Sequence, residues 1–114
     1  MAACIFCRIA AGELGTKFLH ADADVLAFAD LQPQAPVHVL VIPRKHLVSL
    51  AQSSGQDDAL LGHVLATARS VAQQLGVDTS GYRVVLNTGS DGGQSVHHLH
   101  AHLLAGRPLG WPPG

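Results

Sequence analysis

The chain has 114 residues, of which 47% are hydrophobic and only 13% are charged, so it can supply a core and is not a disordered segment. Its net charge of −1 argues against the basic surface that long nucleic acids require. No apolar run is long enough to span a membrane and "MAACIFCRIAAGELG" is not a secretory leader, so we expect one cytoplasmic domain over residues 1–114.

The first half of the chain is expected to form one short helix and three strands. Apolar residues at helical spacing predict an amphipathic helix over 4–14. Residues 17–31 are typical of two short strands joined by a polar turn, and two prolines predict a loop over 32–36. The β-branched run "VHVLVIP" predicts a strand over 37–43.

The second half contains the clearest helix, over 57–75, which Gly76 is expected to end. Its apolar stripe consists of Leu60, Leu61, Val64, Leu65, Ala68, Val71, Ala72 and Leu75. Strands are expected over 82–87 and 95–104, with a polar loop between them. Together these elements predict an α+β fold in which a five-stranded, mostly antiparallel sheet accompanies one long and one short helix.

The last expected strand carries three histidines at alternate positions, His98, His100 and His102. Side chains alternate faces along a strand, so these imidazoles should form a row, with His97 on the other face. The outer two would be rooted about 13 Å apart, which is too far for all three to bind one metal ion.

A row of imidazoles suits phosphoryl chemistry. Neutral imidazole is a nucleophile and a proton carrier near neutral pH, and it can form a covalent intermediate with phosphorus. A neighbouring ring can stabilise the developing charge by donating a hydrogen bond. A single histidine on a strand is more often an ordinary surface or core residue, but three in alternation beside "NTGSDGGQS" favour a functional site.

The sequence resembles the histidine triad (HIT) superfamily of nucleotide hydrolases and transferases, in particular its histidine triad nucleotide-binding (Hint) branch. The resemblance rests on "CIFCRI", "LAFADLQPQAPVHVLVIPRKH", "LNTGSDGGQSVHHLHAHLLAGR" and the terminal "WPPG", in matching order over essentially the whole chain. It implies the HIT-like α+β fold.

The resemblance also implies catalytic roles. His100 corresponds to the nucleophile that attacks the α-phosphorus, and His102 to the residue that hydrogen-bonds the phosphate oxygens. His98 corresponds to the triad member that supports the central ring. Ser95 matches a hydroxyl near the phosphate and the leaving group, although the proton donor could equally be a triad imidazole.

Further residues correspond to the family's nucleotide-binding positions. Asp30 matches the carboxylate that binds both ribose hydroxyls, and Leu31 follows it against the sugar. The positions expected near the phosphate are Asn87, Gly93 and Gln94. The expected apolar walls of a purine site are Phe6, Ile9 and Phe28.

Each of these residues also has an ordinary structural explanation. Asp30 could cap the turn that follows it, Asn87 could end a strand, and the apolar wall residues could be plain core. His20, His38 and His63 have no role that the sequence supports, and we expect His63 to be structural or exposed.

Cys4 and Cys7 offer half of a tetrahedral zinc site. In the family resemblance, His46 and His98 complete a Cys₂His₂ set with a structural, non-catalytic zinc ion. The alternative is a pair of thiols on a short helix, since a disulfide is not expected in the cytosol.

Function follows from the same resemblance. It implies a hydrolase of the adenosine 5′-monophosphoramidase type, which releases AMP or GMP from purine nucleoside phosphoramidates or acyl derivatives through a His100-nucleotidyl intermediate. It also implies a homodimer in which residues 106–114, including Trp111, form an arm toward the partner's site. Alternatives are a dinucleoside polyphosphate hydrolase, a zinc hydrolase that uses a His-x-His pair, and a non-catalytic nucleotide-binding module.

Overall fold

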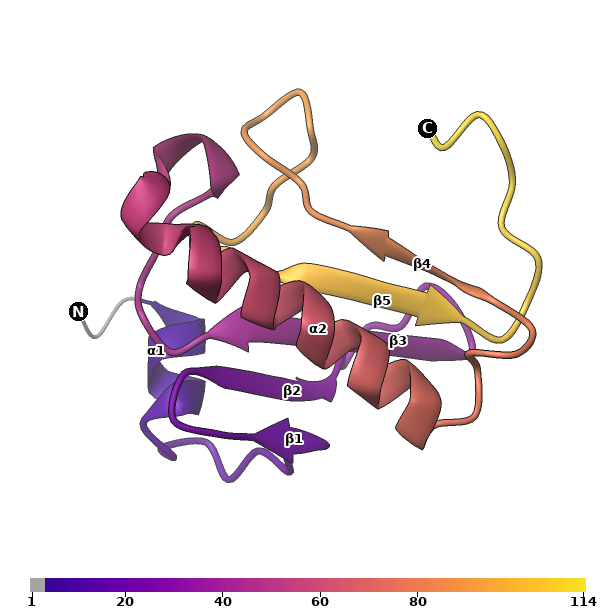
Figure 1. Cartoon of the computed structure of the whole chain (residues 1–114), viewed down its shortest axis with the longest axis horizontal. Helices are drawn as coiled ribbons and strands as arrows, with labels where there is room; N and C mark the ends of the chain where they lie inside the picture. Colours follow the sequence, from indigo (N-terminus) through magenta and orange to yellow (C-terminus); the bar gives the residue numbers. More distant parts are fainter. Residues whose placement is uncertain (1–3) are drawn as a thin grey trace.

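The computed structural model describes residues 4–114, so the first three residues of the expected domain lie outside the described part. Five antiparallel strands form one sheet in the order β1-β2-β3-β5-β4 (Figure 1). The strands are β1 (His20–Ala21), β2 (Val25–Ala29), β3 (Val37–Pro43), β4 (Tyr82–Val85) and β5 (Ala101–Ala105). The expected α+β architecture is confirmed.

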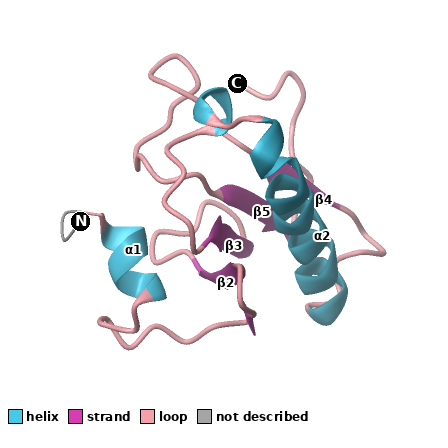
Figure 2. Cartoon of the chain, turned by 60° about the vertical axis from the view of Figure 1, so that its left-hand side comes forward, coloured by secondary structure: helices cyan, strands magenta, loops and turns pink. Residues whose placement is uncertain are grey.

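Two helices cover opposite faces of this sheet. The short helix α1 (Ile5–Ala10) lies on one side and the long helix α2 (Asp58–Gln74) on the other (Figure 2). Two single 3₁₀ turns, η1 (Leu50–Gln52) and η2 (Gly55–Asp57), lead into α2. Because both faces are covered, β2 and β3 are almost continuously buried, which explains why their sequences are apolar without a polar alternation.

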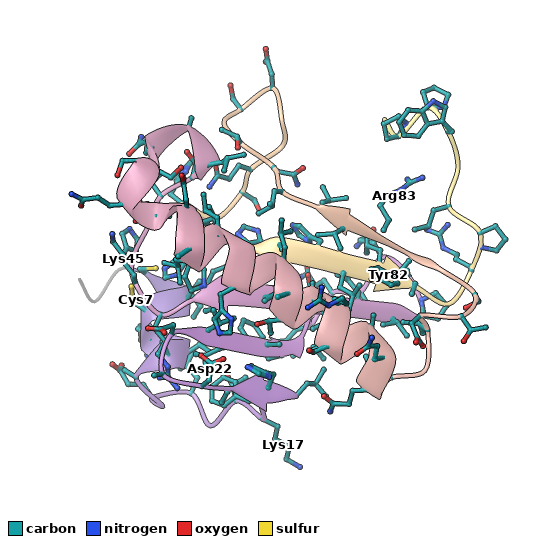
Figure 3. The ribbon with its side chains drawn as sticks, in the orientation of Figure 1. Cys7, Lys17, Asp22, Lys45, Tyr82 and Arg83 are labelled. Carbon is teal, nitrogen blue, oxygen red and sulfur yellow. The ribbon has the colours of Figure 1, made fainter. Side chains whose placement is uncertain are left out.

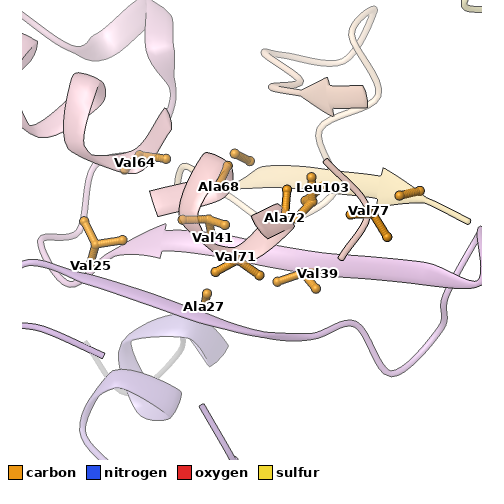
Figure 4. Packing of buried hydrophobic residues seen from close by; sticks show 12 residues of the cluster. Val25, Ala27, Val39, Val41, Val64, Ala68, Val71, Ala72, Val77 and Leu103 are labelled. Atoms are coloured by element: carbon orange, nitrogen blue, oxygen red, sulfur yellow. The ribbon is translucent and has the colours of Figure 1, made fainter. Parts of the chain in front are cut away.

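The main core lies between α2 and the sheet (Figure 4). Strand alternation sends Val25, Val39, Val41 and Leu103 to this face, and each is at most 3% exposed. The smaller cluster on the α1 face consists of Phe6, Ile9, Leu26, Phe28, Leu40 and Ile42. The sheet therefore has a large apolar cluster toward α2 and a smaller one toward α1. Polar side chains lie next to the smaller cluster.

Helix α2 begins and ends close to the predicted residues. The 3₁₀ turn η2, which leads directly into α2, is capped: the Ser54 side chain accepts a hydrogen bond from the Gln56 amide, and the Asp57 carboxylate accepts one from the Ser54 amide in return. At the other end Gly76 has a φ of +72°, which glycine adopts without strain. The apolar stripe is narrower than expected, because Leu65 is 48% and Leu75 is 37% exposed.

The expected extents of the last two strands are wrong. β4 ends at Val85 instead of residue 87, and β5 begins only at Ala101 instead of residue 95. Before that point the chain bonds to the segment that follows β3: the Leu99 amide donates to the Leu47 carbonyl at 2.6 Å. His98 and His100 therefore precede the regular strand, and only His102 belongs to it.

The C-terminal segment leaves β5 and runs back past the outer edge of β4 (Figure 1). Arg83, which points from β4 toward this segment in Figure 3, donates a hydrogen bond from Nη2 to the Gly110 carbonyl at 2.7 Å. Trp111 is 82% exposed beyond that tether. No helix within residues 4–114 has the length and apolar character needed to cross a membrane.

Candidate functional site

The three alternate histidines lie together, but their rings do not face the same way. The centroids of the His100 and His102 rings are 4.8 Å apart. The His98 ring is fully buried and lies beside the two cysteines instead. Phe6 of α1 contacts the rings of both His98 and His100 edge-on, with centroid separations of 5.8 and 5.1 Å. The row therefore divides into a His100–His102 pair and a separate His98.

The hydrogen bonds of His100 assign its tautomer. Its Nδ1 lies 2.8 Å from the backbone carbonyl of His98, and because a carbonyl only accepts, Nδ1 must carry the proton. In the neutral ring Nε2 then holds a free lone pair. Nε2 has no hydrogen-bond partner among the described residues. Since no side-chain nitrogen of these residues is both buried and unpartnered, Nε2 of His100 is accessible to solvent. His98 thus supports the central ring through its main chain.

His102 is oriented by a residue that the sequence did not single out. The Gln34 amide donates to Nδ1 of His38, so the neutral His38 ring carries its proton on Nε2. That Nε2 lies 2.9 Å from Nδ1 of His102, which must therefore accept. The remaining nitrogen of His102, Nε2, is left as a donor. A lone pair on His100 and a donor on His102 are thus set side by side.

Burial keeps these rings neutral. It lowers the pKa of His100 and of His98, because an imidazolium loses hydration inside the protein. For His102, burial together with the neighbouring His100 and His38 lowers the pKa to about 4. At neutral pH the pair therefore consists of neutral imidazoles, and the His100 lone pair is not lost to a proton.

A cavity of about 530 Å³ opens next to this pair. Phe6 lines it and also contacts the His100 ring, while Leu40 lines it and pairs with His102 in the sheet. The remaining lining is mostly apolar and comprises Ile5, Ile9, Leu14, Gly15, Thr16, Lys17, Phe28, Ala29, Asp30 and Leu31. The three expected apolar wall residues, Phe6, Ile9 and Phe28, are thus brought together around one space.

Asp30 is one of the few polar residues that line the cavity. Its Oδ1 accepts a hydrogen bond from the Gln32 amide at 2.8 Å, so the carboxylate does cap the following turn. Its Oδ2 faces Nε2 of His38 at 3.3 Å, and the side chain keeps 21% of its surface exposed. Leu31 is 97% exposed at the rim of the cavity. A turn-capping role and an exposed carboxylate oxygen are therefore compatible in this residue.

The loop before the histidines is held by Gln94. Its side-chain nitrogen donates to the carbonyls of Val48 and Val96, and its oxygen accepts from the Gly89 amide. Gly93 has a φ of +81°, but a side chain there would meet open space. Close packing occurs at Gly92 instead, where a Cβ atom would lie 2.5 Å from the Thr88 carbonyl oxygen. The Gln94 side chain is thus used to shape the loop.

Asn87 and Ser95 flank this loop. Asn87 is half-buried, and the antiparallel register that pairs Val85 with His102 brings it toward His100. Ser95 is exposed. Neither side chain makes a hydrogen bond to another residue of the described chain, so both keep their polar groups available.

The two cysteines meet two histidines at the end of α1. Cys4 Sγ lies 3.4 Å and Cys7 Sγ 3.6 Å from Nδ1 of His98. Nδ1 of His46 lies 3.3 Å from Cys7 Sγ and 3.2 Å from Nδ1 of His98. His98 directs Nε2 at the Pro43 carbonyl, 2.8 Å away, which assigns its proton to Nε2 and leaves Nδ1 free toward the thiols.

This donor set fits a tetrahedral zinc ion. Zinc–nitrogen and zinc–sulfur bonds of about 2.05 and 2.3 Å imply ligand atoms separated by roughly 3.3 to 3.8 Å. The four observed separations, from 3.2 to 3.6 Å, are close to that range. Burial raises the pKa of the Cys7 thiol, and a bound cation would displace its proton.

Comparison with known proteins agrees with this geometry. The HIT domain family matches residues 11–109. The chain therefore belongs to the HIT family. An uncharacterized HIT-like protein of Synechococcus elongatus is 50% identical over 110 residues, which cover 96% of each chain.

Solved structures show the same HIT fold. A HIT family hydrolase from Legionella pneumophila is 46% identical with a TM-score of 0.94, over 97% of this chain and 99% of that one. A histidine triad protein from Clostridium difficile is 44% identical with a TM-score of 0.93, over 96% of both chains. The fold is thus that of HIT family hydrolases.

One residue of this HIT site escaped the sequence analysis. His38 bonds to His102 and faces Asp30, yet its sequence context, "VHVLVIP", predicts only a strand. The only signal in the sequence was that His38 is a single polar residue in an otherwise apolar run. In the structure His38 is only 7% exposed. A pattern of this kind becomes informative only when the strand that pairs with it is known.

Proposed function

We propose that this chain is a purine nucleoside phosphoramidase that acts through a covalent intermediate on His100. The observation that carries the proposal is the paired state of two rings: His100 presents an unprotonated Nε2, and His102 presents a donating Nε2 beside it. A neutral nucleophile next to a donor for the phosphoryl oxygens is the arrangement that displacement at phosphorus requires.

The reaction would proceed in two displacements. Nε2 of His100 attacks the α-phosphorus, the P–N bond breaks, and the departing amine takes up a proton. Water then attacks the nucleotidyl-histidine, which releases the nucleoside monophosphate and restores the His100 lone pair. The first proton comes from Ser95 or from a triad imidazole, and the exposed Ser95 hydroxyl is free to approach a leaving group.

The nucleoside would occupy the cavity beside Phe6. Its apolar walls suit a planar purine, so the released product would be AMP or GMP. The Asp30 carboxylate, which also lines the cavity, suits the ribose hydroxyls. Asn87 and the backbone around Gly93 and Gln94 would lie near the phosphate. In this pose the base would lie in the cavity, and the leaving group would point away from it.

The decisive experiment incubates the chain with adenosine 5′-phosphoramidate and measures AMP release. Because a P–N bond to histidine is labile in acid, alkaline quenching followed by intact-mass analysis at neutral or alkaline pH should detect a protein heavier by one adenylyl group. His100→Ala should abolish both signals, while His97→Ala, which changes an exposed neighbouring histidine, should leave both unchanged. AMP release without any adenylyl-protein, or at the native rate in His100→Ala, would contradict the proposal.

The same assay distinguishes the proposed activity from two alternative functions. A dinucleoside polyphosphate hydrolase would turn over diadenosine polyphosphates faster than the phosphoramidate. A non-catalytic nucleotide-binding module would bind AMP and release none from either substrate.

A metal-dependent hydrolase has one observation in its favour. Donor atoms of Asp30, His38 and His102 lie within 4.8 Å of one another and so could hold a metal ion that activates water. A His-x-His metal pair made of His98 and His100 fits poorly, because His98 directs Nδ1 at the cysteines and His100 directs Nδ1 at a carbonyl. The adenylyl-protein distinguishes covalent catalysis from an activated water.

We further propose a structural zinc ion on Cys4, Cys7, His46 and His98, with no part in bond cleavage. Bound zinc would fix the His98 main chain, whose carbonyl holds the proton on Nδ1 of His100. Elemental analysis should find about one zinc per chain. Cys7→Ser should lose that zinc and lower the melting temperature.

A homodimer is also proposed, with residues 106–114 as the arm. Within the described residues β4 pairs only with β5, so no strand pairs with its outer edge. The 82% exposed Trp111 is available to a partner subunit. Deleting residues 110–114 should change the preference among amine leaving groups and leave AMP affinity similar; an equal change in both would contradict the arm. A cytoplasmic location stays a prediction from the sequence.

A further inference from the structure

A second group of potential metal ligands lies on the α2 face of the sheet, away from the cysteines. His20 belongs to β1, Asp22 to the turn before β2, and His63 to α2. Nε2 of His20 and Nε2 of His63 each lie 2.7 Å from the same oxygen, Oδ2 of Asp22. Two neighbouring residues of β1 and its turn, and one residue of α2 that lies 41 positions beyond Asp22, thus direct three potential metal ligands at one point.

The carboxylate at the centre of this group is fixed in place. Oδ1 of Asp22 accepts hydrogen bonds from the amides of Asp24 and Val25 at 2.8 and 2.9 Å, which leaves Oδ2 to the histidines. The main-chain carbonyl of Asp22 accepts from Nε of Arg44 at 2.8 Å. Figure 3 labels Asp22 at the end of the sheet below α2. A ligand held in this way loses little freedom when it binds an ion.

The charge balance also favours a cation. An aspartate carboxylate is ionised at neutral pH, so Asp22 brings a negative charge to the group. Two nearby cations oppose a metal ion, but Nε of Arg44 donates to the main chain of Asp22, and Nζ of Lys45, which lines the same hollow as His63, pairs with Asp57 at 2.7 Å.

We propose that His20, Asp22 and His63 form a second metal site, for a divalent transition cation of the zinc and nickel class. Two imidazoles and one carboxylate are a common three-ligand set for such ions, with the other positions left to water. The donor atoms all lie within 4.8 Å of one another. With metal bonds of about 2.1 Å, neighbouring ligand atoms lie roughly 3.0 Å apart around an octahedral ion and roughly 3.4 Å apart around a tetrahedral one. Each 2.7 Å pair therefore needs to open by about 0.3 to 0.7 Å.

The side chains leave space for the water ligands. Exposure is 31% for His20, 32% for Asp22 and 42% for His63, so an ion can enter from solvent. Bound metal would join the two-residue strand β1, at the edge of the sheet, to the long helix α2. This predicts that the metal stabilises the fold and leaves turnover at His100 unchanged.

The test uses protein that already carries one equivalent of zinc, so that the cysteine site is filled first. Zinc or nickel chloride is then titrated by calorimetry, and the melting temperature is recorded with and without the second equivalent. We expect a second equivalent to bind to the native chain and to raise the melting temperature by at least about 4 °C.

Four matched variants assign that binding. His63→Gln and His20→Gln should each weaken the second equivalent by at least roughly tenfold and remove the metal-dependent rise. His97→Gln should bind as the native chain does. His102→Ala, which removes a donor of the Asp30–His38–His102 group, should also retain the second equivalent.

Two results would overturn the proposal. One is that the native chain binds no second equivalent, in which case the three residues form only a hydrogen-bonded link between β1 and α2. The other is that His102→Ala loses the second equivalent while His63→Gln keeps it. Melting temperatures measured without added metal show whether each variant still folds, so a folding defect is not mistaken for a lost ligand.

Discussion

The two faces of the sheet treat their histidines differently. On the α1 face, His98 and His100 are at most 6% exposed, and backbone carbonyls fix which ring nitrogen carries the proton. On the α2 face, His20 and His63 are partly exposed, and both bond to a carboxylate. Burial favours the neutral ring, whereas a carboxylate partner accepts a hydrogen bond from a neutral ring and stabilises a charged one.

This difference between the two faces indicates that the α1 face serves catalysis and the α2 face serves the stability of the fold. A neutral ring with a fixed tautomer is a competent nucleophile, so the α1 face is suited to bond cleavage. The α2 face carries the apolar cluster that joins α2 to the sheet, with the His20–Asp22–His63 link at one end. Substitutions on the α1 face should therefore change turnover, and those on the α2 face should change the free energy of unfolding.

The largest expected effect is on the α1 face, in His100→Ala. Loss of the nucleophile should lower the rate of AMP release by roughly 10⁴-fold or more. The melting temperature and AMP affinity should stay close to native values, because the pocket walls are unchanged. Steady-state kinetics measures the rate, AMP titration the affinity and thermal denaturation the melting temperature. A large loss of stability would show that the α1 face also serves the fold.

The next effect is on the opposite face. Leu103 of β5 is completely buried in the cluster between the sheet and α2. Leu103→Ala should lower the free energy of unfolding by about 2 to 5 kcal/mol. Urea denaturation followed by circular dichroism measures this loss. Turnover per folded molecule should change little, and a loss comparable to that of His100→Ala would remove the distinction between the faces.

A smaller effect is expected from the residue that orients His102. His38→Gln removes the ring whose Nε2 donates to Nδ1 of His102 at 2.9 Å, so the His102 proton is no longer confined to Nε2. The rate constant for AMP release should fall roughly 10- to 100-fold, with a smaller change in AMP affinity. An equal loss in rate and affinity would assign His38 to nucleotide binding instead of positioning.

The smallest effect is expected at Asp22. Asp22→Asn weakens the bonds to His20, His63 and two backbone amides, so we expect a loss of about 1 to 2 kcal/mol at pH 7. The folded pKa of Asp22 is depressed, so this stabilisation is complete above the ordinary aspartate pKa of about 4 and declines as the pH falls below it. Unfolding curves at several pH values should show the two proteins converging in acid.

The order and type of the main elements were predictable because apolar periodicity follows from local geometry. A β-branched run identified β3, short apolar segments around a polar turn identified β1 and β2, and a 3.6-residue period identified α2, which ends before Gly76. The start of β5 was not predictable. "SVHHLHAHLL" has the alternation of a strand throughout, yet main-chain bonds to the segment after β3 delay the strand until Ala101.

The sequence by itself determined the two helices, the antiparallel sheet, the grouping of His98, His100 and His102, and the Cys-x-x-Cys pair. Short-range spacing encodes each of these. Only the tertiary structure decided that His98 turns to the cysteines, that His38 meets His102, and that His20, Asp22 and His63 converge on one point. Those contacts join residues up to 94 positions apart, and their geometry depends on how strands and helices pack.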